Sequence, residues 1–162
     1  MIIVLEKLSS KLNRLVEQSL FVLGFSMAAI VAAEVFSRYV LNHSIFWSEE
    51  LARYLLVWLT FLGASVAYRR HAHATVDVIY RRLPHLAKAA SALLVHICSL
   101  LFFGVMIVYG WQFSLFVRLQ ISPALHLPKW IPHAVLPLSG LILFVHALTF
   151  LIKDLERFRR DR

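Results

Sequence analysis

Four long stretches of apolar residues, separated by shorter polar segments, dominate the pattern of the chain. They cover residues 19–40, 49–68, 89–117 and 131–152. Each is long enough to cross a bilayer core about 30 Å thick, which takes about 20 helical residues. None alternates apolar and polar residues as a barrel strand does, and backbone groups in lipid must be satisfied within the segment. The pattern therefore predicts an all-α membrane protein with four transmembrane helices.

The third stretch is longer than a bilayer requires. Residues 89–117 are 29 residues without a formal charge, and a helix of this length extends about 43 Å at 1.5 Å per residue. That exceeds the hydrocarbon thickness. We expect this helix to tilt, or to place part of its length in the interface or against protein.

Residues 1–17 form an amphipathic segment ahead of the first stretch. Leu5, Leu8, Leu12 and Leu15 recur at helical intervals, and the basic residues fall between them. Such a segment predicts an interfacial helix on the membrane surface, or else an extension of the first span into water. A signal peptide is the rival interpretation, but the segment is not the short cationic lead that signal peptides have.

Composition supports a membrane protein and excludes several other classes. Sixty per cent of the residues are hydrophobic and 16% are charged, whereas soluble domains carry about 25% charged residues. Five glycines, five prolines and no low-complexity run exclude a collagen-like or disordered chain. The single cysteine, Cys98, cannot form an internal disulfide, and we expect it to be a small buried side chain.

The distribution of basic residues predicts the orientation. Thirteen of the 17 Lys and Arg residues lie in residues 1–17, in the connection 69–88 and in the tail 153–162. Cytoplasmic segments are enriched in Lys and Arg, so both termini and the middle connection are expected in the cytoplasm. The net charge of +8 then reflects the orientation of the chain in the membrane, and the basic segments are also attracted to anionic lipid. No nucleic-acid partner is expected.

The segment that joins the first two stretches carries most of the candidate chemistry. Glu34 and Arg38 are four residues apart, as are Glu49 and Arg53, so each pair can form on one helix face. A charge near the bilayer centre costs about 2.5–3.5 kcal/mol, so these side chains are not expected to face lipid alone. With Glu50 they are expected to form a polar cluster that bonds the first helices together or to a partner. The alternative is a set of surface charges that snorkel to water.

Two neighbouring residues mark the start of the second helix. Ser48 is a favourable N-cap, and the two acidic residues after it lie where the helix dipole favours anions. Trp47, together with Trp111 and Trp130, falls near the predicted outer face, where indole rings favour the interface.

Small residues recur at four-residue spacing in the first two stretches, where they can permit close helix packing. Chance in an alanine-rich chain is the alternative. The residues are Gly24, Ala28, Ala32, Gly63 and Ala67.

Two histidines lie inside predicted spans. His96 and His146 are each about six or seven residues from the predicted cytoplasmic end, and facing imidazoles in a four-helix bundle could ligate a haem. Each could equally hydrogen-bond a neighbouring helix or a subunit. In the middle connection, His71, His73 and Asp77 lack a fourth ligand and ordinary zinc spacing. We expect neither a metal nor a cofactor.

Taken together, these segments resemble the small membrane subunit of tripartite ATP-independent periplasmic (TRAP) transporters, of the DctQ type. The resemblance extends from about residue 20 to 155. The motifs that carry it are RYVLN at 38–42, FWSEELAR at 46–53, WLTFLGA at 58–64, HATVD at 73–77, Leu83-Pro84 and, more weakly, SPALHLPKW at 122–130 with Pro137.

The resemblance implies a carrier complex in the bacterial inner membrane. In this family a periplasmic binding protein captures an organic acid, and a large multi-span subunit moves it inward with a sodium gradient. The small subunit is implied to enlarge the static scaffold and to help dock the binding protein. Its interface residues here would be Arg38, Trp47, Glu49, Glu50 and Arg53. An enzyme is not expected, because no nucleophile–base pair, phosphate-binding glycine loop or catalytic carboxylate pair is found.

Two other classes remain as alternatives. A four-helix b-type cytochrome would use His96 and His146 as haem ligands. A small proton-coupled exporter would use Glu34 as its intramembrane carboxylate. Such exporters resemble shorter chains with tight loops, whereas this chain has the basic connection 69–88.

Overall fold

Helices make up most of the computed structural model, which describes residues 2–70 and 85–160. Four of these helices are long and apolar enough to cross a membrane, as predicted. In chain order the helices are α1 (Ile2–Tyr39), α2 (Ser48–Arg69), α4 (His85–Phe116), the short α5 (Trp130–His133) and α6 (Val135–Arg160).

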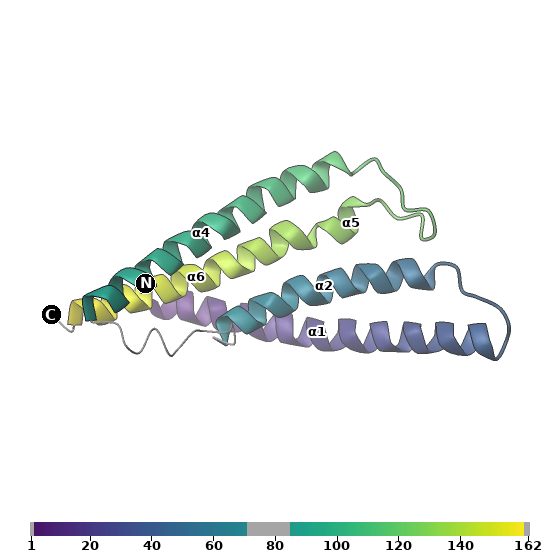
Figure 1. The fold of residues 1–162 in the computed structure, drawn as a ribbon, viewed down its shortest axis with the longest axis horizontal. Coiled ribbons are helices and arrows are strands. Elements are labelled where there is room, and N and C mark those ends of the chain that lie inside the picture. Colours follow the sequence, from purple (N-terminus) through teal and green to yellow (C-terminus); the bar gives the residue numbers. More distant parts are fainter. Residues whose placement is uncertain (1, 71–84, 161–162) are drawn as a thin grey trace.

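The helices are arranged as two hairpins that converge at one end. α1 pairs with α2, α4 pairs with α6, and α6 also contacts both α1 and α2. Figure 1 shows that the start of α1 and the end of α6 lie where the hairpins converge, and this is called the terminal end below. The connections 40–47 and 117–129 lie at the opposite, more open end, called the loop end. The start of α1 and the end of α6 therefore lie at the same end of the bundle, as an even number of crossings predicts.

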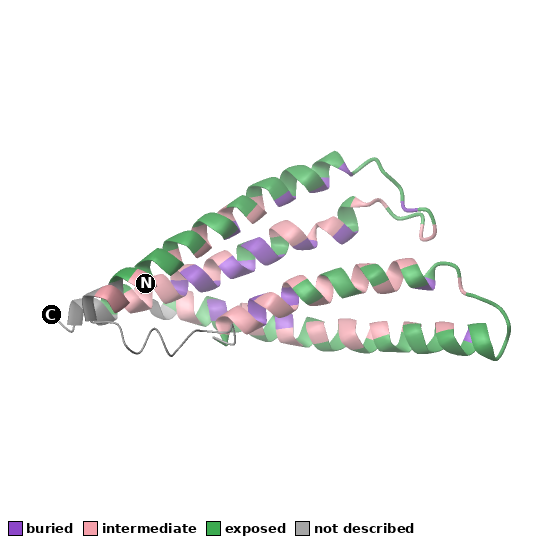
Figure 2. Ribbon diagram, in the orientation of Figure 1, coloured by how far each residue is buried: buried purple, intermediate pink, exposed green. Residues whose placement is uncertain are grey.

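Burial is concentrated on α6. Figure 2 shows buried positions along α6, while much of α1 and the outward side of α4 are exposed. Val135 and Ile142 pack with residues of α1 and α2, and Leu143 and Ala147 pack with Phe103 of α4. Cys98 is exposed, contrary to expectation, because it lies on the outward side of α4. Apolar side chains on such surfaces are stable in lipid, where exposure to hydrocarbon carries no hydrophobic penalty.

Two helices are longer than the spans predicted from sequence. α1 continues unbroken from Ile2 to Tyr39, which agrees with the alternative that the amphipathic segment extends the first span. α6 likewise runs to Arg160 and so includes most of the predicted tail. α4 has 32 residues, about 48 Å of helix, which agrees with the long third span.

α4 and α6 approach each other closely at two glycines. A Cβ added to Gly110 would lie 3.0 Å from the backbone nitrogen of Pro137, and one added to Gly140 would lie 3.1 Å from Met106 Cβ and Ile107 Cγ1. These distances are tighter than ordinary contact. Glycine at both positions therefore lets the two backbones approach closely.

The small residues selected from the sequence do not make such an approach within this chain. A Cβ on Gly24 would lie 3.9 Å from Leu59 Cδ2, and one on Gly63 would meet nothing within 4 Å. Ala28 and Ala32 are exposed, and Ala67 is half-buried. The predicted stripe thus does not account for how α1 and α2 pack.

The start of α2 also differs from the prediction. Ser48 is the first helical residue, and Trp47 occupies the N-cap position without a side-chain hydrogen bond. The Ser48 hydroxyl instead donates to Glu34 Oε2 at 2.9 Å and to the carbonyl of Ile45 at 2.7 Å. A capping hydroxyl accepts a backbone N–H from the position before the helix, whereas Ser48 is already helical and uses its hydroxyl as a donor.

Candidate functional site

Glu34 holds the end of the first hairpin together. Its Oε1 accepts hydrogen bonds from Arg38 Nη2 and Ser44 Oγ, both at 2.7 Å. Its Oε2 accepts from the backbone N–H of Ile45 at 2.8 Å and from Ser48 Oγ at 2.9 Å. One carboxylate therefore joins α1, the connection 40–47 and the first residue of α2.

This arrangement does not suit a proton-carrying carboxylate. Both oxygens of Glu34 are occupied by donors, and its side chain is only 13% exposed. An exporter that used Glu34 would need this carboxyl group to release its partners and bind protons and solute in turn. The contacts identify Glu34 as a structural acceptor instead.

Glu50 joins the two hairpins at the loop end. Its Oε2 accepts from the backbone N–H groups of Ala124 at 2.8 Å and Leu125 at 3.2 Å. Its Oε1 accepts from the Tyr54 hydroxyl at 2.6 Å. Ala124 and Leu125 belong to the connection between α4 and α5, so Glu50 fixes that connection onto α2. The sequence alone has no signal for this partner, which lies 74 residues away.

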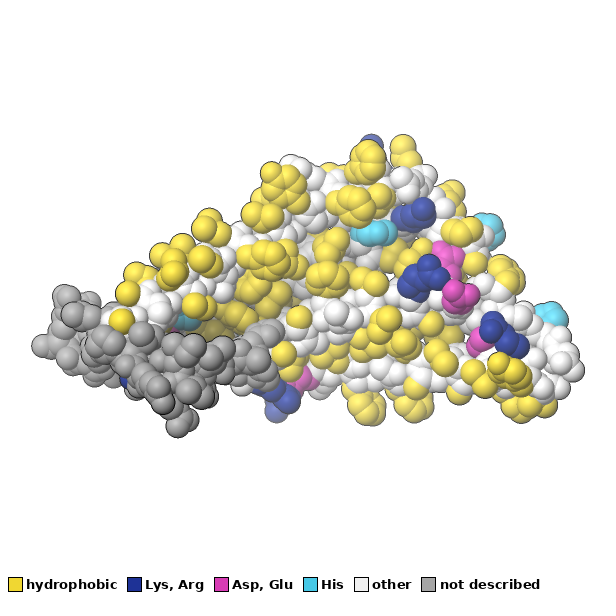
Figure 3. All heavy atoms as spheres, viewed as in Figure 1, with side chains coloured by type: hydrophobic (Ala, Val, Ile, Leu, Met, Phe, Trp, Pro, Cys, Tyr) yellow, Lys and Arg dark blue, Asp and Glu magenta, His cyan; other side chains and the backbone are white. Residues whose placement is uncertain are grey.

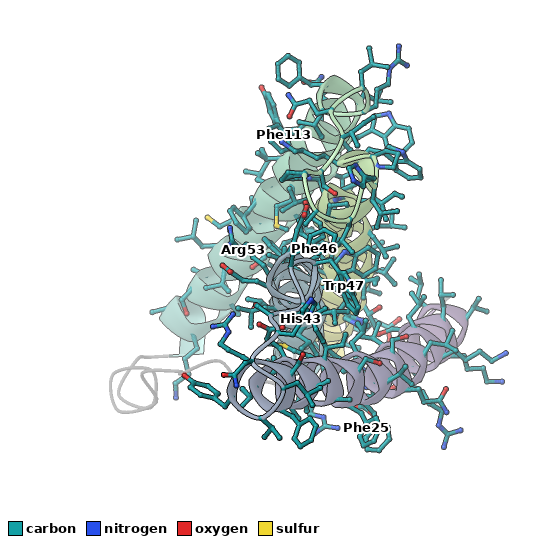
Figure 4. The ribbon with its side chains drawn as sticks, turned by 90° about the vertical axis from the view of Figure 1, so that its right-hand side faces the viewer. Phe25, His43, Phe46, Trp47, Arg53 and Phe113 are labelled. Carbon is teal, nitrogen blue, oxygen red and sulfur yellow. The ribbon has the colours of Figure 1, made fainter. Side chains whose placement is uncertain are left out.

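The pair of Glu49 and Arg53 remains on the surface. Glu49 Oε1 and Arg53 Nη2 are 2.8 Å apart, and their side chains are 77% and 69% exposed. Phe46 is also strongly exposed and Trp47 is partly exposed beside them. Figure 4, which looks onto the loop end, shows Phe46, Trp47 and Arg53 around the start of α2. These side chains are free to contact a partner.

The five charged residues therefore do not form one cluster. Glu34 with Arg38 closes the first hairpin, Glu50 binds the second hairpin, and Glu49 with Arg53 faces outward. The reason is the helical period, since Glu49 and Glu50 point about 100° apart around α2. In Figure 3, acidic and basic side chains gather near the loop end, with hydrophobic side chains covering the middle of the molecule.

The two membrane histidines bond to different helices. His146 is fully buried, and its Nδ1 lies 2.7 Å from Ser9 Oγ on α1. His96 Nε2 lies 2.8 Å from Asp154 Oδ2 on α6. Each ring therefore already hydrogen-bonds a side chain of another helix, His146 to Ser9 on α1 and His96 to Asp154 on α6. His71, His73 and Asp77 lie outside the described residues.

A second polar network at the terminal end was not foreseen. Arg69 on α2 donates to Ser9, the same residue that bonds His146. Arg70 Nη2 pairs with Glu17 Oε1 at 2.6 Å, and Lys153 Nζ pairs with Glu6 Oε1, also at 2.6 Å. α1 is thereby joined to both α2 and α6. Its partners are distant in sequence, so helical spacing alone could not identify them.

Comparison with known proteins places this architecture in a family. The family model described as "Tripartite ATP-independent periplasmic transporters, DctQ component" matches residues 27–157. The chain is 31% identical over 156 residues to the sialic acid TRAP transporter permease protein SiaT of Haemophilus influenzae strain 86-028NP, which covers 91% of this chain and 24% of SiaT.

Two further relatives differ in length. The isethionate TRAP transporter permease protein DctMQ of Oleidesulfovibrio alaskensis is 34% identical over 107 residues, 63% of this chain and 16% of DctMQ. A putative TRAP transporter small permease protein of Haemophilus influenzae strain Rd is 28% identical over 149 residues, 89% of this chain and 92% of that protein. The chain thus spans less than a quarter of SiaT and DctMQ, but nearly the full length of the small permease.

Proposed function

Because the chain belongs to the DctQ family, the small membrane component of TRAP transporters, we propose that it is the scaffold subunit of a sodium-coupled secondary transporter that imports an organic acid anion. It is a multi-pass protein of the bacterial inner membrane, and its relatives are transporter permease components, not enzymes. Neither the cytochrome nor the exporter is favoured, since His96, His146 and Glu34 are engaged in contacts between or within hairpins.

A large permease component is the proposed membrane partner. In SiaT and DctMQ the region similar to this chain is a small share of a longer permease protein. This supports a shared complex in which a small and a large component lie side by side. The names of these two relatives, for sialic acid and isethionate, support an organic acid as cargo.

The observation that carries the scaffold proposal is the double fixation of the loop end by Glu34 and Glu50. Glu34 closes the first hairpin through the backbone N–H of Ile45, and Glu50 fixes the second hairpin onto the first through the backbone N–H groups of Ala124 and Leu125. A carrier domain can move through the membrane only against a body that does not move with it. A four-helix body fixed at both ends, with most of its surface apolar, is suited to that role.

A periplasmic binding protein is the proposed partner at the loop end. The predicted orientation places this end in the periplasm, and the exposed Glu49–Arg53 pair, Arg38 and Trp47 lie there. Exposed charges at such a surface contribute to the rate and orientation of docking. The same surface would not select the cargo, which we assign to the other components.

Reconstitution tests this proposal. Proteoliposomes containing the large component and the binding protein should take up the organic acid under a sodium gradient only when this chain is present. Vesicles with this chain alone should take up none. Uptake by this chain alone, or full uptake without it, would contradict the scaffold role.

A further inference from the structure

An apolar groove of about 620 Å³ lies between α4 and the α5–α6 segment near the loop end. On α4 and just beyond it, the lining runs from Ile107 through Trp111 and Leu115 to Arg118. On the other side it runs from Trp130 to Leu141. Along each side the lining residues recur every three or four positions, so the groove follows one face of each helix.

The length of the groove matches one leaflet of a membrane. Ile107 and Arg118 are eleven positions apart, as are Trp130 and Leu141, and eleven helical steps of 1.5 Å span about 16 Å. Half of a hydrocarbon core about 30 Å thick is about 15 Å. The groove therefore reaches from the interface at the loop end to about the middle of the bilayer.

The chemistry of the groove suits a hydrocarbon chain. Apart from Arg118, the lining offers one polar side chain, Ser114, and its hydroxyl already donates to the Gly110 carbonyl at 2.8 Å. A volume of about 620 Å³ spread over about 16 Å of length gives a mean cross-section of roughly 40 Å². A helix with its side chains, 10–12 Å across, needs roughly 80–110 Å². A helix could therefore lie in the groove only in part.

The mouth of the groove carries a cation and two indole rings. Arg118 is exposed, and its side chain has no hydrogen bond or ion pair with any of the described residues. Trp111 and Trp130 are 59% and 47% exposed. Tryptophan favours the membrane interface, and arginine can lay its apolar stem along a groove while its guanidinium binds phosphate.

We propose that this groove binds one phospholipid of the leaflet at the loop end, with an acyl chain between α4 and α6 and its phosphate on Arg118. The lipid lies along the groove beside the close contact that the two helices make at Gly110 and Gly140. It makes the small subunit a lipid-binding protein in its own right, independent of its role in transport.

Native mass spectrometry of the full chain in detergent tests the proposal, with palmitoyl-oleoyl phosphatidylglycerol added as the probe. Arg118→Gln should weaken retention of the lipid about tenfold, because it removes the phosphate contact. Ala134→Phe, which fills the groove, should abolish retention. The matched control is Lys129→Gln, a cation of the same connection that does not line the groove, and it should change retention less than twofold.

Leu115→Trp is a second groove-filling variant. Only variants whose helicity and size-exclusion elution volume match those of the wild type are compared. Equal lipid retention by wild type, Arg118→Gln and the groove-filling variants would overturn the proposal. Groove-filling variants that retain lipid but lose the large permease component on co-purification would also overturn it, since the groove would then hold protein.

Discussion

Glu50 on α2 accepts a backbone hydrogen bond of 2.8 Å from Ala124, a residue of the connection between α4 and α5. This contact and its neighbour at Leu125 join the two hairpins at the end where they are otherwise most separated. At the terminal end the hairpins are joined by Ser9, Arg69 and His146. The bundle is thus fastened at both ends by polar contacts and between them by apolar packing.

The Glu50 contact predicts protected amides in the connection 117–129. Glu50→Gln removes the charge and leaves a single acceptor oxygen, so the amides of Ala124 and Leu125 should exchange hydrogen about tenfold faster. Hydrogen exchange with mass spectrometry of this segment measures the effect. Glu49→Gln, whose side chain is exposed and contacts Arg53, should leave the exchange unchanged. Equal exchange in both variants would mean that Glu50 does not hold the connection.

Gly110, packed between α4 and α6, and Gly63 on α2, where a Cβ meets nothing, predict opposite signs for the same substitution. Gly110→Ala places a Cβ 3.0 Å from the backbone of Pro137, so it should lower the free energy of unfolding by about 1–3 kcal/mol. Gly63→Ala meets nothing within 4 Å and should raise it by up to about 1 kcal/mol through helix propensity. Denaturation in mixed micelles compares the two. A stabilising Gly110→Ala would show that the helices do not pack as described.

Reversal of both acidic residues at the start of α2 should impair the complex. Glu49→Lys with Glu50→Lys should reduce co-purification of the large permease component, or uptake, without changing which solute is accepted. Glu50→Lys breaks the contact to Ala124, whereas Glu49→Lys alone alters only the exposed surface. Measuring the two single variants separates the loss of the Ala124 contact from the change of the exposed surface. Normal assembly and uptake in the double variant would remove both residues from the proposed interface.

His146 is predicted to be structural. His146→Ala removes a fully buried ring and its bond to Ser9, so it should lower the free energy of unfolding by about 2–4 kcal/mol. His43→Ala, at an exposed histidine in the first connection, should change it by less than about 0.5 kcal/mol. The absorption spectrum of the wild-type protein should lack a Soret band. A Soret band that His146→Ala abolishes would restore the haem interpretation.

The charge distribution predicts the sidedness of the bundle. In a Cys98→Ser background, Leu41→Cys and Leu119→Cys, both at exposed positions of the loop end, should react with an impermeant maleimide added to intact spheroplasts. Arg162→Cys should react only after the membrane is opened. Labelling of position 162 in intact spheroplasts would contradict the predicted orientation.

The apolar runs along the chain were sufficient to locate the membrane-spanning helices, but they did not give the residues at which these helices end. Uninterrupted apolar runs located α2 and α4 closely, because a span must hide its backbone from lipid. The predicted fourth span ends at residue 152, before the charged residues Lys153 and Asp154, whereas the helix α6 runs on through them to Arg160. In the fold they bond to Glu6 and His96, and these partners allow α6 to continue.

The sequence by itself determined that the chain is a four-helix membrane protein, which residues pair at i, i+4, and which family it resembles. These properties depend on hydropathy, helical period and local motifs, all of which are read along one segment at a time. Only the tertiary structure decided that Glu50 holds a distant connection, that Gly110 and Gly140 set the helix approach, and that His96 and His146 have separate partners. Each of these depends on how two hairpins lie against each other, and that geometry arises from contacts between residues far apart in the chain.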